Sequence, residues 1–109
     1  MNDHFLLVAS RDPWTHPATR RCYDLAAHLA AEGRHVTLFL VQNGVLPARR
    51  GSTSAQLQGL SREGVRVLAD DFSLRERGIV AGRLAKGVEA ASLEVVIEAL
   101  EEGAKALWH

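Results

Sequence analysis

Two runs of apolar residues constrain the fold of this chain more than any other feature. Phe5–Ala9 and Val36–Val41 are apolar along almost their whole length, whereas a strand with one solvated face alternates apolar and polar residues. Continuous runs of this kind are typical of parallel strands that are covered on both faces. Between them, apolar residues spaced by three and four predict a helix from about Pro17 to Glu32. This order of elements indicates an α/β fold with a mostly parallel sheet.

The rest of the chain repeats this alternation. The expected elements are a helix capped by Ser52 and ending near Glu63, a strand at Val65–Ala69, a short helix from Leu74 to before Gly78, a strand near Gly87–Glu89, a helix from Ser92 to Glu102 and a strand from Ala104 to Trp108. The segment from Gln42 to Gly51 is expected to be a loop. Ser73 and Glu76 match a capping box, so Ser73 is the expected N-cap of the short helix. In the last helix, the residues expected to face the sheet are Leu93, Val96, Ile97 and Leu100.

Length and charge limit the classes of protein to which the chain can belong. At about 100–200 residues per domain, its 109 residues give a single domain that spans 1–109. Thirteen basic and 13 acidic side chains leave no net charge, which argues against nucleic acid or anionic lipid as a partner. No apolar run approaches the roughly 20 residues that cross a bilayer, and the start of the chain lacks the features of a secretory signal. We therefore expect a cytoplasmic protein without a membrane partner.

The polar residues that follow the strands mark the expected binding crevice. Ligands of open α/β sheets gather beyond the carboxyl ends of the strands. Here those ends carry Ser10, Arg11 and Asp12 after the first strand, Asn43 after the second, and Asp70 and Asp71 after the third, with Ser73 and Arg77 next in the chain. No glycine-rich phosphate-binding motif follows the first strand, which excludes the common nucleotide signatures. We expect no cofactor.

The three aspartates leave two interpretations open. Asp12, Asp70 and Asp71 can converge around a hard cation such as Mg²⁺. Alternatively, Asp70 and Asp71 stabilise turns or accept backbone hydrogen bonds near the following helix. The chain lacks the acidic pair after the first strand and the lysine after the last strand that receiver domains use, so no metal site is expected.

Three other side chains have both a structural and a functional interpretation. Cys22 is the only cysteine, and it shares an apolar helical stripe with Leu25 and Leu29, which favours an inert core thiol over a nucleophile assisted by neighbouring basic groups. His16 lies in the loop after the first strand, where it either begins the helix or enters the crevice. Trp14, in the same loop, lines a pocket, forms an interface or covers the edge of the sheet.

Several segments resemble the DsrE/DsrF-like family, small proteins of sulfur metabolism that include the Tus and Dsr sulfur-relay subunits. The resemblance rests on AHLAAEGRHVTLFLVQNGV (residues 27–45), on Arg77-Gly78-Ile79 after a short helix, and on Gly87-Val88 followed by Ser92-Leu93. It covers nearly the whole chain. It implies a flavodoxin-like three-layer sandwich, in which helices cover both faces of a five-stranded parallel sheet, and assembly into homo-oligomers or hetero-oligomers with related subunits.

The resemblance also implies where a sulfur-carrying cysteine would lie. Active members carry it just after the third long strand, where it holds a persulfide and passes the sulfur to a partner protein. Aligned on Arg77-Gly78, that position is Asp70, or Asp71 or Ser73 if the loop is shifted, and no cysteine occurs between Val67 and Gly78. A carboxylate cannot replace the thiolate, because sulfur transfer needs a sulfur atom that attacks and then holds the cargo.

These observations lead to one favoured function and two alternatives. The chain is expected to be a DsrE/DsrF-like subunit that has lost the persulfide-carrying cysteine and acts by oligomerisation or partner binding rather than as an enzyme, with a sulfur-carrier protein as a further candidate partner. The first alternative is a sulfur carrier that uses Cys22 instead. The second is binding of a small ligand or metal in the strand-end crevice.

Overall fold

The computed structural model describes residues 3–50 and 55–108 of the chain. Its elements are β1 (His4–Ala9), α1 (Pro17–Ala31), β2 (His35–Leu40), η1 (Gln42–Ala48), α2 (Ala55–Arg62), β3 (Arg66–Asp70), α3 (Asp71–Glu76), η2 (Ala81–Arg83), β4 (Val88–Ala91), α4 (Glu94–Glu101) and β5 (Lys105–Trp108). The predicted cap Ser52 lies outside the described residues. None of the described helices is long and apolar enough to cross a membrane.

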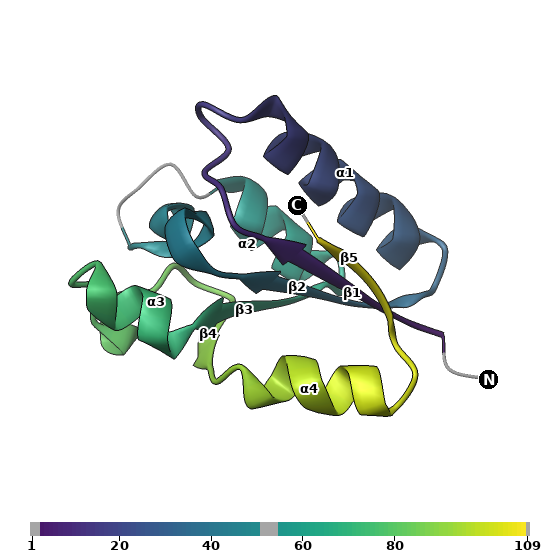
Figure 1. The fold of residues 1–109 in the computed structure, drawn as a ribbon. Helices are drawn as coiled ribbons and strands as arrows, with labels where there is room; N and C mark the ends of the chain where they lie inside the picture. Colours follow the sequence, from purple (N-terminus) through teal and green to yellow (C-terminus); the bar gives the residue numbers. More distant parts are fainter. Residues whose placement is uncertain (1–2, 51–54, 109) are drawn as a thin grey trace.

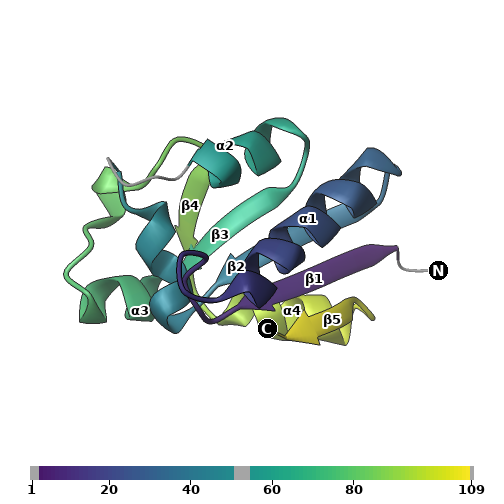
Figure 2. The ribbon, with the colours of Figure 1, turned by 90° about the horizontal axis from the view of Figure 1, so that it is seen from above.

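The five strands form one parallel sheet in the order β4-β3-β2-β1-β5. The chain steps from β1 to β4 in one direction and then returns across the sheet through α4, so that β5 pairs with the free side of β1 (Figure 1). Seen from above in Figure 2, α1 runs along β1 and β2, whereas α2 lies toward β3 and β4. This arrangement confirms the predicted α/β sandwich with helices on both faces.

The face under α1 and α2 holds the larger of two cores. Alternate strand residues, such as Leu7, Leu38 and Val67, point to this side and are almost fully buried. They pack against Cys22, Tyr23 and Ala26 of α1 and against Leu57 and Leu60 of α2. The predicted stripe of α1 is therefore correct in outline, although Leu25 and Leu29 are only partly buried.

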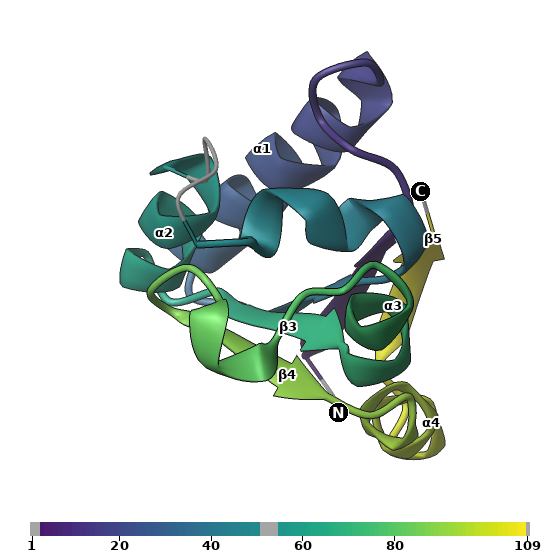
Figure 3. The same ribbon diagram turned by 90° about the vertical axis from the view of Figure 1, so that its left-hand side faces the viewer.

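The opposite face is covered by α4, which lies alone below the sheet in Figure 3. Its core consists of Leu6, Val8, Phe39, Val41, Leu68, Val96 and Ala99. The prediction for this helix was only partly right, since Leu93, Ile97 and Leu100 are about half exposed. The helix is eight residues long, and Ala99 rather than its larger neighbours completes the stripe that touches the sheet.

Two further expectations need correction. The segment predicted as a loop after β2 forms the 3₁₀ helix η1, which includes Pro47 and buries Gly44 and Val45. The short helix α3 begins at Asp71 rather than Leu74, and its N-cap is Asp70 rather than Ser73. The carboxylate of Asp70 accepts the hydrogen bonds that a capping residue accepts, and the sequence S-x-x-E offered a competing position three residues later.

Candidate functional site

The carboxyl ends of β1, β2 and β3 meet at a tight backbone junction. The Val41 N–H donates to the Ala9 carbonyl at 3.0 Å, and the Gly44 N–H donates to the Val41 carbonyl at 2.8 Å. A Cβ at Gly44 would lie 2.1 Å from the Ala9 carbonyl oxygen, so only glycine allows η1 to pack this closely on the end of β1. This contact fixes the position of Gln42 and Asn43 beside the loop that follows β1.

Asp70 is the centre of a buried hydrogen-bond network at the end of β3. Its Oδ2 accepts from the Ser73 backbone N–H at 3.0 Å and from the Ser73 hydroxyl at 2.7 Å. The Ser73 Oγ in turn accepts the Gln42 N–H at 2.9 Å. Gln42 has a φ of 51°, in the left-handed region that costs energy for a residue with a side chain. The network therefore holds a strained turn after β2 against the first turn of α3.

A cleft of about 860 Å³ opens beyond these strand ends. Seven of the nine residues predicted for the crevice line it: Ser10, Arg11, His16, Asn43, Asp70, Ser73 and Arg77. The structure thus places these side chains, from three separate segments of the chain, around one cavity. Its lining combines two arginines and a histidine with carboxylates and hydroxyls, so the cleft contains polar groups and both signs of charge.

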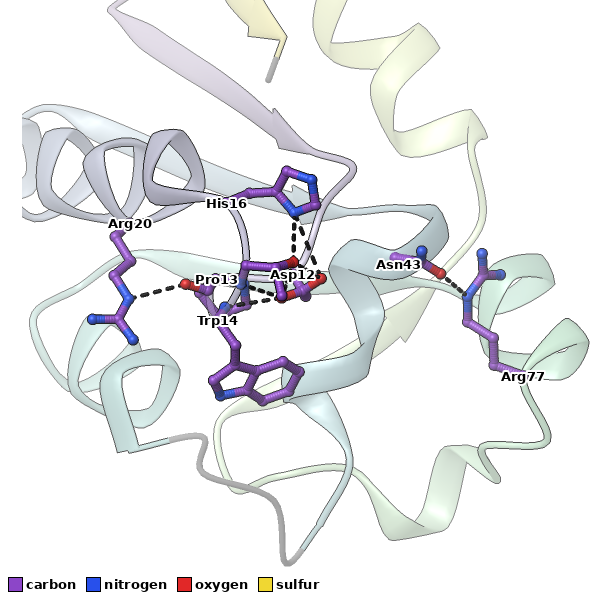
Figure 4. A network of polar contacts seen from close by, with 8 residues as sticks. Asp12, Pro13, Trp14, His16, Arg20, Asn43 and Arg77 are labelled. Atoms are coloured by element: carbon purple, nitrogen blue, oxygen red, sulfur yellow. Dashed lines mark hydrogen bonds and ion pairs between the residues drawn. The ribbon is translucent and has the colours of Figure 1, made fainter.

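Arg77 is held in place on one side of this cleft. Its Nε donates to the Asn43 Oδ1 at 3.0 Å (Figure 4), and its Nη1 donates to the Ser73 carbonyl at 3.3 Å. These bonds join η1 to the end of α3. They also orient the guanidinium, which is a planar group suited to binding anions.

Asp12 is one of the two predicted residues that do not line the cleft. Its carboxylate closes the turn after β1 by accepting from the Trp14 and Thr15 N–H groups, each at 2.9 Å, and from the Thr15 hydroxyl at 2.8 Å. The bond from the Thr15 N–H is the main reason that the pKa of Asp12 lies below its usual value, and His16, 3.6 Å away, adds to this effect. Asp12 therefore shapes the loop that carries His16.

Asp71 is the other residue outside the cleft, and it does not join Asp12 and Asp70 around a cation. Its carboxylate faces Arg75 one turn later in α3, at 3.8 Å. Asp70 is committed to capping, and across residues 3–50 and 55–108 no three His, Cys, Asp or Glu side chains are arranged to hold a metal ion. The interpretation of Asp70 as an acceptor of backbone hydrogen bonds is confirmed.

Cys22 lies away from the cleft, inside the core under α1. The residue is 1% exposed, and burial raises the pKa of its thiol to about 11. A thiol in this environment is protonated at neutral pH and is a poor nucleophile. His16 takes the N-cap position of α1 without a side-chain capping bond. Its Nδ1 lies 2.9 Å from the Thr15 hydroxyl, and the residue lines the cleft.

Sequence reasoning missed several residues that line the cleft. Phe72 and Trp108 are 57% and 68% exposed and form apolar parts of its wall, and Leu93 and Glu76 also line it. Trp108 ends β5, so the rule that ligands gather at carboxyl strand ends would have included it. Phe72 is the first residue after Asp70 and Asp71, and no pattern in the sequence distinguishes it from an apolar residue of the core.

Comparisons with known proteins agree with this geometry. The family model described as "DsrE/DsrF-like family" matches residues 3–108. Among solved structures, the Escherichia coli ychN protein is similar with a TM-score of 0.88 and 23% identity, and all of each chain is covered. The protein MTH1491 of unknown function from Methanobacterium thermoautotrophicum has a TM-score of 0.79 and 22% identity, again over all of both chains.

A third structure is more distant. BT1422, a conserved protein of unknown function from Bacteroides thetaiotaomicron, has a TM-score of 0.74 and 14% identity, with 98% of this chain and 95% of that chain covered. No curated protein matches the chain in sequence. The structural likenesses establish the fold, and the family match supports a protein related to sulfur metabolism. On the match over residues 3–108, the chain belongs to the DsrE/DsrF-like family.

Proposed function

We propose that this chain is a DsrE/DsrF-like subunit that does not carry sulfur and acts by assembling with further copies of itself. The observation that supports this most is the role of Asp70. The position that the family resemblance assigns to a persulfide-forming cysteine holds a carboxylate whose bonds stabilise the chain's own fold. The stretch from Val67 to Gly78 contains no thiol.

The surroundings of Asp70 are adapted to a carboxylate rather than to a sulfur cargo. Ser73 donates both its N–H and its O–H to the Asp70 carboxylate, and Asp70 is 8% exposed. A cysteine here would lose both of these charge-assisted bonds, which are stronger than those between neutral groups. The negative charge of Asp70 would also repel an anionic persulfide at the base of the cleft.

The alternative carrier, Cys22, is not supported by its environment. A sulfur acceptor must reach solvent as a thiolate, whereas Cys22 is packed in the core with a pKa of about 11. Arg20 and His16, two basic residues close to Cys22 in the sequence, make bonds elsewhere: Arg20 to the Pro13 carbonyl, and His16 to Thr15. We expect this thiol to react only when the chain unfolds.

A sulfur-loading experiment tests this part of the proposal. After treatment with inorganic polysulfide and removal of excess reagent, intact mass spectrometry should find no added sulfur on the folded wild type. Cys22→Ser is the matched control. In that background, Asp70→Cys should gain an adduct, because it returns a thiol to the base of the cleft. Sulfur on the wild type that is absent from Cys22→Ser would contradict the proposal and favour the alternative carrier.

The surface of α4 and β5 supports assembly. Leu93, Ile97 and Leu100 of this segment are half exposed, and β5 adds Trp108, which is 68% exposed and pairs with Val8 of the α4 core. We call these four residues the α4/β5 face. β5 is also an edge strand, paired with β1 on one side only. Clustered exposed apolar residues are typical of interaction sites, and an unpaired edge is a template for further contact.

A second copy of the chain is the occupant that the charge balance favours. Thirteen positive and 13 negative side chains give no net charge, so identical copies have no overall repulsion to overcome. Light scattering coupled to size-exclusion chromatography should therefore give a mass that is a multiple of the monomer mass. Ile97→Glu should shift the protein toward monomer, because it places a charge within the α4/β5 face. Val80→Glu is the control, since Val80 is 63% exposed but lies between α3 and η2. A monomer at all concentrations would refute self-assembly.

The cleft itself favours a second candidate function, the binding of a small anion. Arg77, oriented by Asn43, and Arg11 both line it, and neither makes an ion pair among the described residues. Thermal unfolding with sulfate, thiosulfate and acetate would test this, because a ligand at about 100 times its Kd adds about 2.7 kcal/mol to stability. A midpoint that is unchanged in the wild type with all three anions would contradict it.

A further inference from the structure

A second cavity lies apart from the strand-end cleft. It measures about 310 Å³ and opens between the loop after β1, the helix α1, the 3₁₀ helix η1 and the start of α2. Its apolar walls come from Pro13, Trp14, Pro47 and Leu57, and its polar groups come from Arg20, Tyr23 and Gln56. None of these residues lines the strand-end cleft or belongs to the α4/β5 face.

Tyr23 gives this cavity a buried polar group that the fold does not satisfy. The residue is 1% exposed, and within the described part of the chain its hydroxyl is the one buried side-chain polar atom without a hydrogen-bond partner. Burial, and to a lesser extent the nearby Cys22 and Asp12, raise the pKa of Tyr23, so the phenol stays protonated and can donate. An unsatisfied buried hydroxyl costs stability and calls for a specific explanation.

Arg20 supplies a positive charge at the same cavity. Its Nε donates to the Pro13 carbonyl at 3.0 Å, which fixes the guanidinium against the loop. Its terminal nitrogens make no hydrogen bond or ion pair to the described residues. Figure 4 shows Arg20 and Trp14 on either side of Pro13, whereas Asn43 and Arg77 lie farther away on the opposite side. The Arg20 guanidinium thus has donors to offer beside a flat aromatic ring, and the buried hydroxyl of Tyr23, which also lines the cavity, is a second donor without a partner among the described residues.

These groups define the chemistry of a ligand. One guanidinium and one neutral hydroxyl match one carboxylate, which accepts hydrogen bonds through both oxygens. The nearby carboxylate of Asp12 disfavours a doubly charged phosphate. The indole of Trp14 and the rings of Pro13 and Pro47 offer surfaces against which a flat apolar group can pack. The volume lies at the lower end of the range of roughly 300–1,000 Å³ for small-molecule pockets.

We propose that this cavity binds a small monocarboxylate with a flat apolar body, with Arg20 and Tyr23 holding the carboxylate and Trp14 packing against the body. The proposal is independent of the proposed function, because it uses neither Asp70 nor the α4/β5 face. A result against one of them leaves the other unaffected.

Benzoate is a suitable probe, and benzamide is its uncharged counterpart of nearly the same shape. Titration of the full chain, followed by ¹H–¹⁵N NMR, should show saturable shifts for benzoate at Trp14, Tyr23 and Leu57. Benzamide should bind at least about tenfold more weakly, since it lacks the charge that pairs with Arg20. Equal affinity for the two compounds, or no saturable shift with benzoate, would overturn the proposal. Shifts confined to Arg11, Asn43 and Arg77 would also overturn it, because they would place the site in the strand-end cleft.

Variants distinguish binding from a structural role. Arg20→Gln should weaken benzoate binding by about tenfold. Arg21→Gln, which removes an exposed charge from the neighbouring position of α1, should leave it unchanged. Because Arg20 also supports the loop, Arg20→Lys serves as a second variant: it keeps the charge, and its benzoate affinity should lie between those of the wild type and Arg20→Gln.

Tyr23→Phe gives the most specific signature. It removes the unsatisfied hydroxyl, so the ligand-free protein should unfold at the same temperature or a higher one, while benzoate binding weakens several-fold. A purely structural hydroxyl would give the opposite pattern, a lower unfolding temperature with unchanged benzoate affinity. That result would overturn the assignment of Tyr23 as a ligand-binding group.

Discussion

The two faces of the sheet are covered very differently. Among residues 3–50 and 55–108, α1 and α2 cover a core of 19 buried residues on one face, which includes Tyr23, Leu38 and Leu60. On the other face, α4 is the one described helix that covers the core, which has seven buried residues in the same part of the chain. The helices α1 and α2 connect neighbouring strands on the first side, whereas α4 lies on the opposite side in the connection that returns from β4 to β5 (Figures 1 and 3).

This difference follows from the connectivity. Consecutive steps from β1 to β3 place one helix above each pair of strands, and right-handed crossovers put both helices on the same side. The return from β4 to β5 is a single connection, so only one helix is available for the opposite face. The exposed apolar residues of α4 are therefore the part of the sandwich that the chain alone leaves incomplete, and a second copy is the proposed cover.

The largest expected effect comes from truncating one leucine in a helix on each face of the sheet, which tests whether the two faces differ in burial. Leu60→Ala, in α2, should lower the free energy of unfolding by about 2–5 kcal/mol, because Leu60 is 4% exposed and its loss leaves a cavity. Leu100→Ala, in α4, should cost less than about 1 kcal/mol at low protein concentration, since this side chain is 49% exposed. Urea unfolding of both variants measures the difference.

Protein concentration sharpens this test. If copies cover the α4/β5 face, the cost of Leu100→Ala should rise with concentration, whereas the cost of Leu60→Ala should not. Equal losses for the two variants at low concentration would show that the faces do not differ as described.

The second prediction concerns Gly44, whose close contact with Ala9 lets η1 pack against the end of β1 beside the larger core. Gly44→Ala should destabilise the protein by about 3 kcal/mol, because the added methyl group would meet the Ala9 carbonyl oxygen at 2.1 Å and the backbone must shift. Gly59→Ala is the matched control. Gly59 lies in α2 with nothing within 4 Å of its added Cβ, so alanine should stabilise that helix by up to about 1 kcal/mol. Thermal unfolding of the pair checks both signs.

Much of the fold was predictable because burial on both faces leaves a clear pattern. The apolar runs at Phe5–Ala9 and Val36–Val41 located the central strands within a residue at each end, and Gly33, with a φ of 83°, follows the end of α1. The error in α4 has a physical cause. An apolar stripe shows that a helix face avoids water but not what covers it, and Ile97 and Leu100 follow the same spacing as buried residues.

The cleft was predictable to a similar extent. The rule that sites form at carboxyl strand ends found seven lining residues, because it depends only on strand order and direction. It could not show which carboxylates were already engaged. Asp12 and Asp70 each accept a backbone N–H from the residue three positions later. These bonds depend on the φ and ψ angles of the local turns, which the residue types alone do not determine. The cavity at Tyr23 was hidden for a related reason, since Tyr23, Pro47 and Leu57 come from segments far apart in sequence.

The third prediction concerns Asp70, the N-cap of α3 at the carboxyl end of β3. Asp70→Ala should lower the free energy of unfolding by about 1–2 kcal/mol, because α3 loses its capping acceptor and the Ser73 hydroxyl loses its partner. Asp71→Ala is the matched control: its carboxylate is 3.8 Å from Arg75 near the surface, so the cost should stay below about 0.5 kcal/mol. Similar losses for the two variants would show that Asp70 is not the structural cap described.

The smallest expected effect is a pH dependence at the amino end of the sheet, where β1 approaches the end of α4. The His4 ring stacks on His35 with centroids 4.0 Å apart, and its Nε2 lies 2.8 Å from the Thr37 hydroxyl. Burial is the main cause that lowers the pKa of His4 from 6.5, the charges of His35 and Arg66 act in the same direction, and Glu102 opposes them. The folded protein therefore binds this proton more weakly than the unfolded chain.

The sign follows from this difference. The contribution of His4 to stability is complete above about pH 6.5 and is lost as the pH falls through the lower pKa of the folded state. Because the ring is only partly buried, the loss should stay below about 1 kcal/mol. Urea unfolding at pH 7.5 and 5.5 should give a smaller difference for His4→Gln than for the wild type, whereas His28→Gln, on the exposed surface of α1, should behave as the wild type. If the free energy of unfolding of His4→Gln changes between pH 7.5 and 5.5 as much as that of the wild type, the proton is taken up by another group and His4 does not cause the pH dependence.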